Sequence, residues 1–478
     1  MGGLFAALNA SATSLDAYQD ALNVTQNNVS NASTPGYAAQ NALFNPLQFD
    51  PAGGEVGGVA FGGVASLRNE SAEQSVQEQQ SALGSSQTLV QTLTALQPSI
   101  GISTTSGISG SLTQFFSSFA ALSENPNDAT DQQQAIVQAQ NVSAAFQDAA
   151  SAVAQAGESA NQQISSTVST INNLAANIAQ LNQSQAQSTP PDPNTDASIH
   201  SDLETLSEYV NFTSSFSTQG TVTVAIDGQT PLVVGATSYA IQSGAAPASA
   251  TAEFPAGVPS QQILDSSGQD ITGQITGGQL NGLLQFRNAT VAGLQGDQNQ
   301  QGSLNQLAQG FADRVNTLLT NGESSAGPPV VPGVALFQYN AADATGVAGS
   351  LSVTAITGSQ IASISPGPPY SANGVAQQIG NLGNSTTPAD LIDGQTFTAF
   401  YAQTAAGVGQ QLSDATTNQT QYTQTVAQAQ SLRSSLSGVS LDQEAVQLTA
   451  FQASYEATSK LVTILATLTQ STIDIIQS

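Results

Sequence analysis

The chain has 478 residues, of which 32 are Asp or Glu and only 5 are Lys or Arg, so its formal net charge is -27. This excess of acid argues against binding to nucleic acid or to anionic membranes, because both require clustered cations. The absence of Cys excludes disulfides, thiolate metal sites and cysteine nucleophiles.

The N-terminal segment differs from a secretory signal. Its first cation is Arg68, so no positively charged stretch precedes an apolar one. No apolar run approaches the roughly 20 residues needed to cross a bilayer. We therefore expect neither a standard signal peptide nor a membrane span.

Heptad patterns predict a helix at each end of the chain. Spacings of three, four and seven residues put each apolar set on one stripe, as in the seam of a coiled coil. An ordinary amphipathic helix on a globular core would show the same periodicity. The seams could pack on each other, on neighbouring copies, or both; in a lone chain we expect the two helices side by side. The seam positions are Leu8, Leu15, Leu22 and Val29 near the start, and Leu448, Phe451, Tyr455, Val462 and Leu465 near the end.

Four inner segments also carry apolar residues at helical spacing, namely residues 112–122, 142–153, 164–178 and 304–318. Their polar positions hold Gln, Asn and Ser rather than charged pairs. Such helices have weak intrinsic stability, so they depend on packing against one another.

Sequence with a β pattern interrupts these helices. Apolar residues alternate over 222–226, Asp227-Gly228 supplies a hairpin turn, and Leu232 and Val234 alternate again. The Pro- and Gly-rich stretch from 327 to 388 predicts a smaller β insertion with long loops.

The resulting fold class is multidomain and mainly α with inserted β. It has terminal coiled-coil helices, a helical rod domain built from discontinuous segments, and outer β-rich domains. The expected parts are an N-terminal helix and loop (1–65), the rod domain in three pieces (66–195, 276–325 and 396–435), an inserted β-rich domain (196–275), a β and loop insertion (326–395) and a C-terminal helix (436–478).

No motif in the sequence predicts catalysis or a cofactor. His200 is the only histidine and has no G-x-S-x-G nucleophile elbow to serve. Lys460 is the only lysine and lies in the C-terminal helix, so no phosphate-binding P-loop can form. Asp192 to Asp196 opens like a calcium loop, but Ala197 stands where that loop needs Gly and Leu203 where it needs an acid. We therefore predict no catalytic, cofactor or metal site.

Residues 24–37 read Val-Thr-Gln-Asn-Asn-Val-Ser-Asn-Ala-Ser-Thr-Pro-Gly-Tyr. This resembles the N-terminal signature of the flagellar axial proteins (rod, hook and hook-associated), usually Ala-Asn-Asn-Ile-Ala-Asn-x-x-Thr-Pro-Gly-Tyr. The Pro-Gly pair fits the centre of a type II turn, and the Asn side chains can satisfy backbone groups where a helix ends. The matching residues are Asn27, Asn28, Asn31, Thr34, Pro35, Gly36 and Tyr37.

Three further segments resemble the hook-associated protein 1 family within this group. Residues 437–455 are similar to its Gly-Val-x-Leu-Asp-Glu-Glu-Ala…Leu…Phe-Gln-x-x-Tyr end. Residues 112–128 end in Asn-Pro-Asn-Asp, where the family has Asn-Pro-x-Asp. Residues 277–287 read Gly-Gly-Gln-Leu-Asn-Gly-Leu-Leu-Gln-Phe-Arg and match its Gly-Gly-x-Leu-x-Gly-Leu-Leu-x-Phe-Arg. Taken in order, these segments extend the resemblance over about half of the chain.

Two places depart from the family pattern. Tyr37 is followed by Ala38-Ala39 where the family often has Ser-Arg, and the often cationic segment before the β domain is here Asp196 to Leu206, with no Arg. The family's charge-paired contacts between subunits at these places do not carry over to this chain.

The resemblance implies a structural subunit with no cofactor and no enzymatic activity. Its terminal helices would form the inner tube of the flagellar axis, with the inserted domains pointing outward. The subunit would leave the cell through the type III export channel, aided by a chaperone at the C-terminal helix. It would then assemble with its own copies into a ring or helical layer between the hook protein and hook-associated protein 3, outside the cell.

Three other interpretations are weighed at this stage. One is a hook or distal-rod protein of the same axial family, against which residues 125–128 and 283–287 speak. Another is a secreted adhesin-like surface protein, which would normally carry a cleavable signal. The third is an enzyme, such as a wall hydrolase fused to an axial protein; it needs a compact acid site in the middle of the chain, and the sequence offers no candidate.

Overall fold

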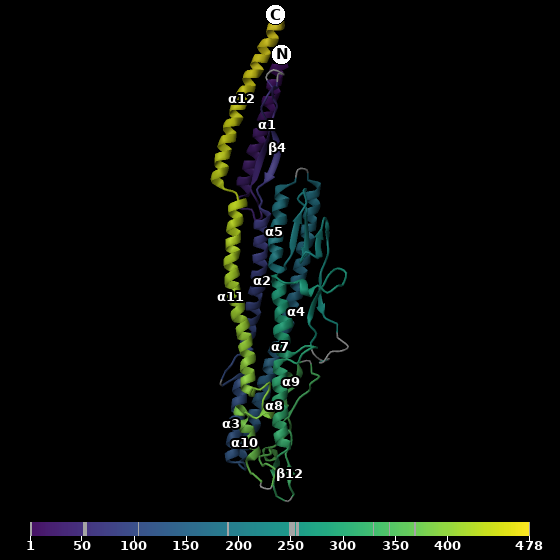
Figure 1. Ribbon diagram of the computed structural model, residues 1–478, viewed down its shortest axis with the longest axis vertical. Helices are drawn as coiled ribbons and strands as arrows, with labels where there is room; N and C mark the ends of the chain where they lie inside the picture. Colours follow the sequence, from purple (N-terminus) through teal and green to yellow (C-terminus); the bar gives the residue numbers. More distant parts are fainter. Residues whose placement is uncertain are drawn as a thin grey trace. The chain divides into compact units, whose positions relative to one another are not determined.

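The computed structural model describes residues 2–50, 55–103, 105–188, 191–247, 254, 258–327, 329–343, 345–367 and 370–477 (Figure 1). The chain forms two compact units. Unit 1 comprises residues 1–81, 171–239 and 422–478, and unit 2 comprises residues 82–170 and 240–421. Within the described part of the chain, no helix is long and apolar enough to cross a membrane.

The two ends of the chain lie together in unit 1. Helix α1 (Gly2–Asn31) runs alongside α12 (Leu441–Gln477), which confirms the expected side-by-side packing (Figure 1). A long antiparallel hairpin packs on α1. Its strands are β1 (Gln40–Pro46) with β4 (Val59–Ser66), continued by β2 (Phe49–Asp50) with β3 (Glu55–Val56).

Small side chains on α1 explain why a hairpin can approach this helix closely. The most buried face of α1 consists of small and polar residues rather than leucines. One of them, Ser14, accepts a hydrogen bond on its Oγ from the Val59 backbone N–H at 3.0 Å. This contact requires the strand backbone to lie against the helix surface. The residues of this face are Ser11, Ser14, Ala17, Ala21, Thr25 and Asn28.

The rest of unit 1 is a small sheet and parts of three long helices. The helices are α2 (Glu70–Ile100), α4 (Ala129–Gln187) and α11 (Phe397–Ser437), each shared with unit 2, while α5 (Pro193–Tyr209) lies in unit 1 alone. The antiparallel sheet has the order β5-β6-β7-β8, formed by Thr213–Phe216, Val222–Ile226, Thr230–Val234 and Thr237–Ser238.

The predicted hairpin turn between β6 and β7 is confirmed. Asp227 and Gly228 both have positive φ, at 49° and 67°, as a type I′ turn requires. The predicted alternation of Leu232 and Val234 is wrong, because Leu232 and Val233 are buried while Val234 is exposed. The cause is a register shift between Val224 and Ala225, which disturbs the alternation of faces.

Unit 2 is built on helices that bury a common aromatic core. Its own helices are α3 (Gly107–Glu124), α6 (Gly278–Gln285), α7 (Ala292–Gln295), α8 (Ser303–Thr320), α9 (Gly346–Ser350) and α10 (Gly374–Asn381), with a π-helical turn over Phe286–Val291. Its two-stranded sheets pair β9 (Gln242–Ala245) with β10 (Gln261–Leu264), β11 (Glu323–Ser325) with β12 (Val331–Pro332), and β13 (Phe337–Gln338) with β14 (Ser352–Val353).

The four predicted apolar stripes all form buried helix faces, in α3, α4 and α8. This confirms the mainly α fold class with small inserted sheets. The division into seven segments stays a prediction, and the two compact units cut across it. Strands β5 to β8 belong to unit 1, whereas β9 and β10 belong to unit 2.

The core of unit 2 depends on contacts between rings from different helices. Phe115 lies 4.8 Å from Phe119 and 5.1 Å from Phe311, measured between ring centroids. We expect Phe115→Ala to lower the free energy of unfolding of unit 2 by about 3–5 kcal/mol, because it removes a fully buried ring and leaves a cavity. Amide exchange in α8 measures this. Thr113→Ala, on the exposed side of the same helix, is the control, and equal exchange in both variants would contradict the assignment.

Candidate assembly site

The signature segment ends α1 and turns the chain through its own hydrogen bonds. Asn31 Nδ2 donates to Asn27 Oδ1 at 2.6 Å, and Thr34 Oγ1 donates to Asn31 Oδ1 at 3.1 Å. The Tyr37 backbone N–H then donates to the Thr34 carbonyl at 3.2 Å. Gly36, at the third position of this turn, has φ +72°, which confirms the expected type II geometry.

Gly36 also brings the loop against α5. A Cβ at this position would clash with the carbonyl oxygen of Ala197. Arg68 Nη2 donates to the Gly36 carbonyl at 2.7 Å. The glycine is therefore required twice, for its backbone conformation and for the close approach of α5.

One buried amide joins both ends of the chain. Asn28 is 1% exposed and uses its full hydrogen-bonding capacity. Its Oδ1 accepts from the Gln40 N–H at 2.9 Å and from the Tyr37 hydroxyl at 3.0 Å. Its Nδ2 donates to the Gln40 carbonyl at 2.8 Å and to Glu444 Oε1 at 2.9 Å. Asn28 thus ties α1 to the signature loop, to β1 and to the first turn of α12.

The carboxyl group of Glu444 is largely shielded from solvent. The residue is 5% exposed, and its Oε2 has no hydrogen-bond partner within the described residues. Burial raises the pKa of Glu444, although the bond from Asn28 acts in the opposite direction. Burial, together with the charge of Glu444, also raises the pKa of Tyr37 to about 12. The site therefore keeps the Tyr37 phenol protonated and makes the Glu444 carboxyl easier to protonate than a free one.

Two of the few arginines stabilise the same junction. Arg68 binds Glu73 Oε1 and Asp196 Oδ2, both at 2.8 Å. Arg433, near the end of α11, binds Glu204 at 2.7 Å and Glu73 at 3.2 Å. Glu73 on α2 therefore bridges both guanidinium groups.

Both places that depart from the family pattern lie at this junction. The segment from Asp196 to Leu206, which lacks the family's cations, supplies the carboxylates that hold Arg68 and Arg433. Ala38 and Ala39 are buried, and the Ala39 N–H donates to the Ser437 carbonyl at 2.9 Å. Small side chains fit this position between β1 and the end of α11.

His200 is a core residue of α5. Its ring stacks on Phe216 with centroids 4.7 Å apart and planes inclined by 8°, and neither ring nitrogen has a hydrogen-bond partner among the described residues. Burial lowers the pKa of His200 well below its usual range, and the nearby Arg68 and Arg433 lower it further. The imidazole ring is therefore neutral and serves as a packing group in the core.

The segment that opens like a calcium loop begins α5. Asp192 is the N-cap residue, and its carboxylate accepts hydrogen bonds from the backbone N–H groups of Asn194 and Thr195. In the part of the chain that the structure describes, no group of three His, Asp or Glu side chains could hold a metal ion.

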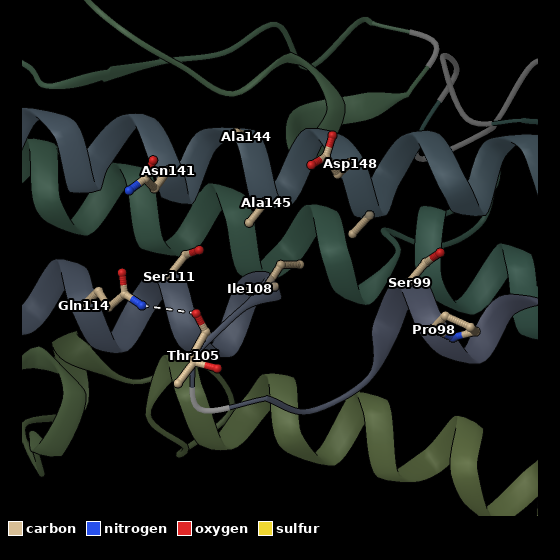
Figure 2. A pocket seen from close by; sticks show the side chains of 12 residues that line it. Pro98, Ser99, Thr105, Ile108, Ser111, Gln114, Asn141, Ala144, Ala145 and Asp148 are labelled. Atoms are coloured by element: carbon tan, nitrogen blue, oxygen red, sulfur yellow. Dashed lines mark hydrogen bonds between the residues drawn. The ribbon is translucent and has the colours of Figure 1, made fainter.

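A cavity of about 470 Å³ in unit 2 offers no catalytic arrangement (Figure 2). It lies between the end of α2, the start of α3 and α4. Its polar lining includes Ser99 and Asn141, and Gln114 Nε2 donates to the Thr105 carbonyl at 3.2 Å. Asp148 is the one ionisable residue among those that line it, so a hydroxyl nucleophile there would have no histidine or lysine base.

The predicted seam residues are only partly covered within the chain. Leu8, Leu15 and Leu22 are half-buried, and Val29 is 45% exposed. The C-terminal seam is half-buried throughout; the ring of Phe451 lies 5.8 Å from that of Phe44 on the hairpin. The role of these residues between copies stays a prediction.

Sequence reasoning missed several residues that build the junction, among them Gln40, Arg68 and Glu444. Glu444 lies inside the C-terminal motif, so the resemblance could have pointed to it. Arg68 is the first cation of an acidic chain, so the sequence predicts that it forms an ion pair but does not predict with which residues. The contacts of Gln40 with Asn28 run through the Gln40 backbone and leave no pattern in the sequence.

Comparison with known proteins identifies the family. The model of the flagellar hook-associated protein FlgK helical domain matches residues 93–337, just over half of the chain. The chain belongs to the FlgK family. A second model, the C-terminal region of the flagellar basal body rod FlgEFG proteins, matches residues 430–475. The family is structural, so the chain is a flagellar component and not an enzyme.

Individual FlgK relatives agree with this assignment. Flagellar hook-associated protein 1 of Bacillus subtilis is 23% identical over 504 residues, covering 97% of both chains. The Salmonella typhimurium protein of the same name is 28% identical over 329 residues, covering 67% of this chain and 57% of that protein. The solved flagellar hook junction protein FlgK from Burkholderia pseudomallei shares the fold, with a TM-score of 0.64 at 18% identity. That match covers 76% of this chain and all of the solved one.

Substitutions of Glu444 test the buried amide cluster. Glu444→Gln keeps an acceptor for Asn28 Nδ2 and removes a buried charge, so we expect stability to be unchanged or raised. Glu444→Ala leaves that donor unsatisfied and should cost about 1–3 kcal/mol. Amide exchange in the first turns of α12 measures both, with the exposed Gln443→Ala as control. Equal losses in the Gln and Ala variants would show that the hydrogen bond is not the stabilising contact.

His200→Phe tests the buried imidazole. The folded-state pKa is lowered, so the unfolded chain binds the proton more readily and stability is lost as pH falls below about 6.5. Phe keeps the stacked ring and removes two unpartnered nitrogens, so we expect the free energy of unfolding to rise by about 1 kcal/mol at pH 7. The difference in free energy of unfolding between the variant and the unaltered chain should be larger at pH 5. Chemical denaturation at both values measures it, and a gain independent of pH would refute the neutral, buried histidine.

Proposed function

We propose that this protein is a subunit of the junction between hook and filament and joins the axial structure through its terminal helices after type III export. The hydrogen bond between Asn28 and Glu444 carries this proposal. It links the N-terminal signature to the C-terminal motif, so that both ends of the chain act as one assembly element.

Signature and seam have different parts in this proposal. The signature residues, Asn27 to Tyr37, fix the path of the chain where the terminal helices meet α5 and α2. The seam residues of α1 and α12 remain half-buried or, at Val29, exposed, so apolar surface is left for contacts with other subunits. Copies of the chain would form a ring or helical layer through these helices.

The partners follow from this position in the flagellum. The hook protein would lie on one side of the layer and hook-associated protein 3 on the other. The apolar surface of α12 must be shielded before assembly, which fits a chaperone bound to this helix inside the cell. A chain without Cys can cross into an oxidising exterior with no thiol chemistry.

Electron microscopy of a strain that lacks the gene tests the proposed function. We expect hooks without filaments, with filament protein released into the medium, and filaments restored by the unaltered gene. Normal filaments in the deletion strain would refute a role at the junction. Loss of the hook itself would instead favour a hook or rod protein.

Phe451→Asp tests whether the terminal helices assemble the subunit. A charge beside Phe44 would lie unpaired in an apolar contact and cost several kcal/mol once the surface is fully covered. The variant should therefore be exported and fail to restore filaments, while unit 2 melts as before. Thr449→Asp, on the exposed face of α12, should restore filaments. Filaments from the Phe451 variant would refute the seam, and lost melting of unit 2 would point to a general folding defect.

A further inference from the structure

The largest uncovered apolar side chains belong to unit 1. Among the described residues, the three most exposed large apolar side chains are Ile475 at 74%, Phe49 at 71% and Val446 at 70%. Two of them lie on α12 and the third on the hairpin. None belongs to the predicted seam, so a surface other than that seam is left open.

The exposed residues of α12 form a second stripe along the helix. The stripe lies roughly 135° around the helix from the seam, at about 3.6 residues per turn. Apart from Val446, the first half of the stripe consists of alanines, and the second half consists of leucines and isoleucines. A partner can therefore approach the helix closely at one end and bury more apolar surface at the other. The outer stripe consists of Val446, Ala450, Ala453, Ala457, Leu461, Ile464, Leu468 and Ile475, all exposed.

The far end of the hairpin presents an aromatic side chain. Phe49 on β2 is the register partner of Val56 on β3, and both are exposed. The Phe49 ring lies over the backbone of Gly57, where a Cβ would come within 3.2 Å of it. A two-stranded ribbon is marginal by itself, so an uncovered aromatic residue on it gains from a second packing surface.

A groove links the stripe to the inner packing of unit 1. Its volume is about 360 Å³, and it is lined by Ala10 and Ser14 of α1, Val56 of the hairpin, and Leu461 and Leu465 of α12. Leu461 belongs to the outer stripe and Leu465 to the seam. The outer stripe is therefore continuous with the interface between α1 and α12.

The charges beside the two surfaces are opposite. Lys460 precedes Leu461 and is exposed; it forms no salt bridge with any residue that the structure describes. Asp50 follows Phe49 and is also exposed. In a chain with 32 acids and a single lysine, an open cation beside an apolar stripe favours a partner that brings a carboxylate.

We propose that a second copy of this chain covers the outer stripe with the end of its hairpin, so that Phe49 packs on Leu461 and Ile464, and Asp50 lies beside Lys460. The contact joins two different surfaces. Each copy therefore keeps one free hairpin and one free stripe, and the contact repeats along a ring or helix instead of stopping at a dimer. This proposed contact rests on the proposed function, because it requires copies of the chain to assemble in the flagellum.

Engineered cysteines test the contact, because the chain has none of its own. Phe49→Cys and Ile464→Cys are co-expressed as separate chains in the deletion strain, and isolated flagella are treated with a short thiol crosslinker. We expect linked dimers only when both variants are present. Thr463→Cys, one residue away on the polar side of α12, is the matched control and should link much less to Phe49→Cys.

The other outcomes overturn the proposal. Dimers from Ile464→Cys alone would show that two α12 helices pair, and a link from it to another flagellar protein would show a different occupant. Equal crosslinking of Phe49→Cys to Thr463→Cys and to Ile464→Cys would show that the hairpin has no preference for the outer stripe. Filaments without the expected link would refute the contact and leave the proposed function intact, whereas normal filaments in the deletion strain would refute the proposed function instead.

Reversing the charges gives a second measurement that needs no crosslink. Lys460→Glu or Asp50→Lys alone should reduce the fraction of hooks that carry filaments, because each sets like charges together. Both substitutions in one chain restore opposite charges between copies and should recover filaments. Unchanged melting of the purified variants separates this from misfolding, and failure of the double variant to recover would overturn the pairing.

Discussion

The hydrogen bonds of Asn28 are the constraint on which unit 1 depends. A single side-chain amide satisfies the backbone of Gln40 and binds the carboxyl of Glu444, 416 residues further along the chain. Burying an amide is favourable only when all its groups are paired, so these partners must arrive together. The closure of the signature loop and the positions of β1 and of the first turn of α12 therefore depend on the same set of hydrogen bonds.

The ion pairs around Arg68 extend the same junction to α2, α5 and α11. Buried ion pairs contribute little net stability, because desolvation offsets most of the attraction. Their geometry is specific, however, since Arg68 reaches Glu73, Asp196 and the Gly36 carbonyl at once. In a chain with few cations, these specific contacts of Arg68 select one packing arrangement of helices that are each only weakly stable.

The two apolar surfaces of α12 differ in how far the chain itself covers them. The seam meets α1 and the hairpin within the chain, as the ring contact between Phe44 and Phe451 shows. The outer stripe is left uncovered. A long helix with polar residues of low charge has little stability of its own, so both surfaces matter to its order.

The sequence by itself determined the two terminal helices, the four inner helical stripes, the place where the β6–β7 hairpin turns, and the type II turn at Gly36. These features follow from spacing and from local backbone preferences, which act within a few residues. The signature and the motifs also indicated the family. Only the tertiary structure decided which face of α1 is buried, because the approach of the hairpin backbone selects small residues such as Ser14 and Ala21 over Leu15 and Leu22. It also decided that Arg68 and Glu444 meet the signature, since partners so distant in sequence are chosen by packing and by the need to satisfy buried polar groups.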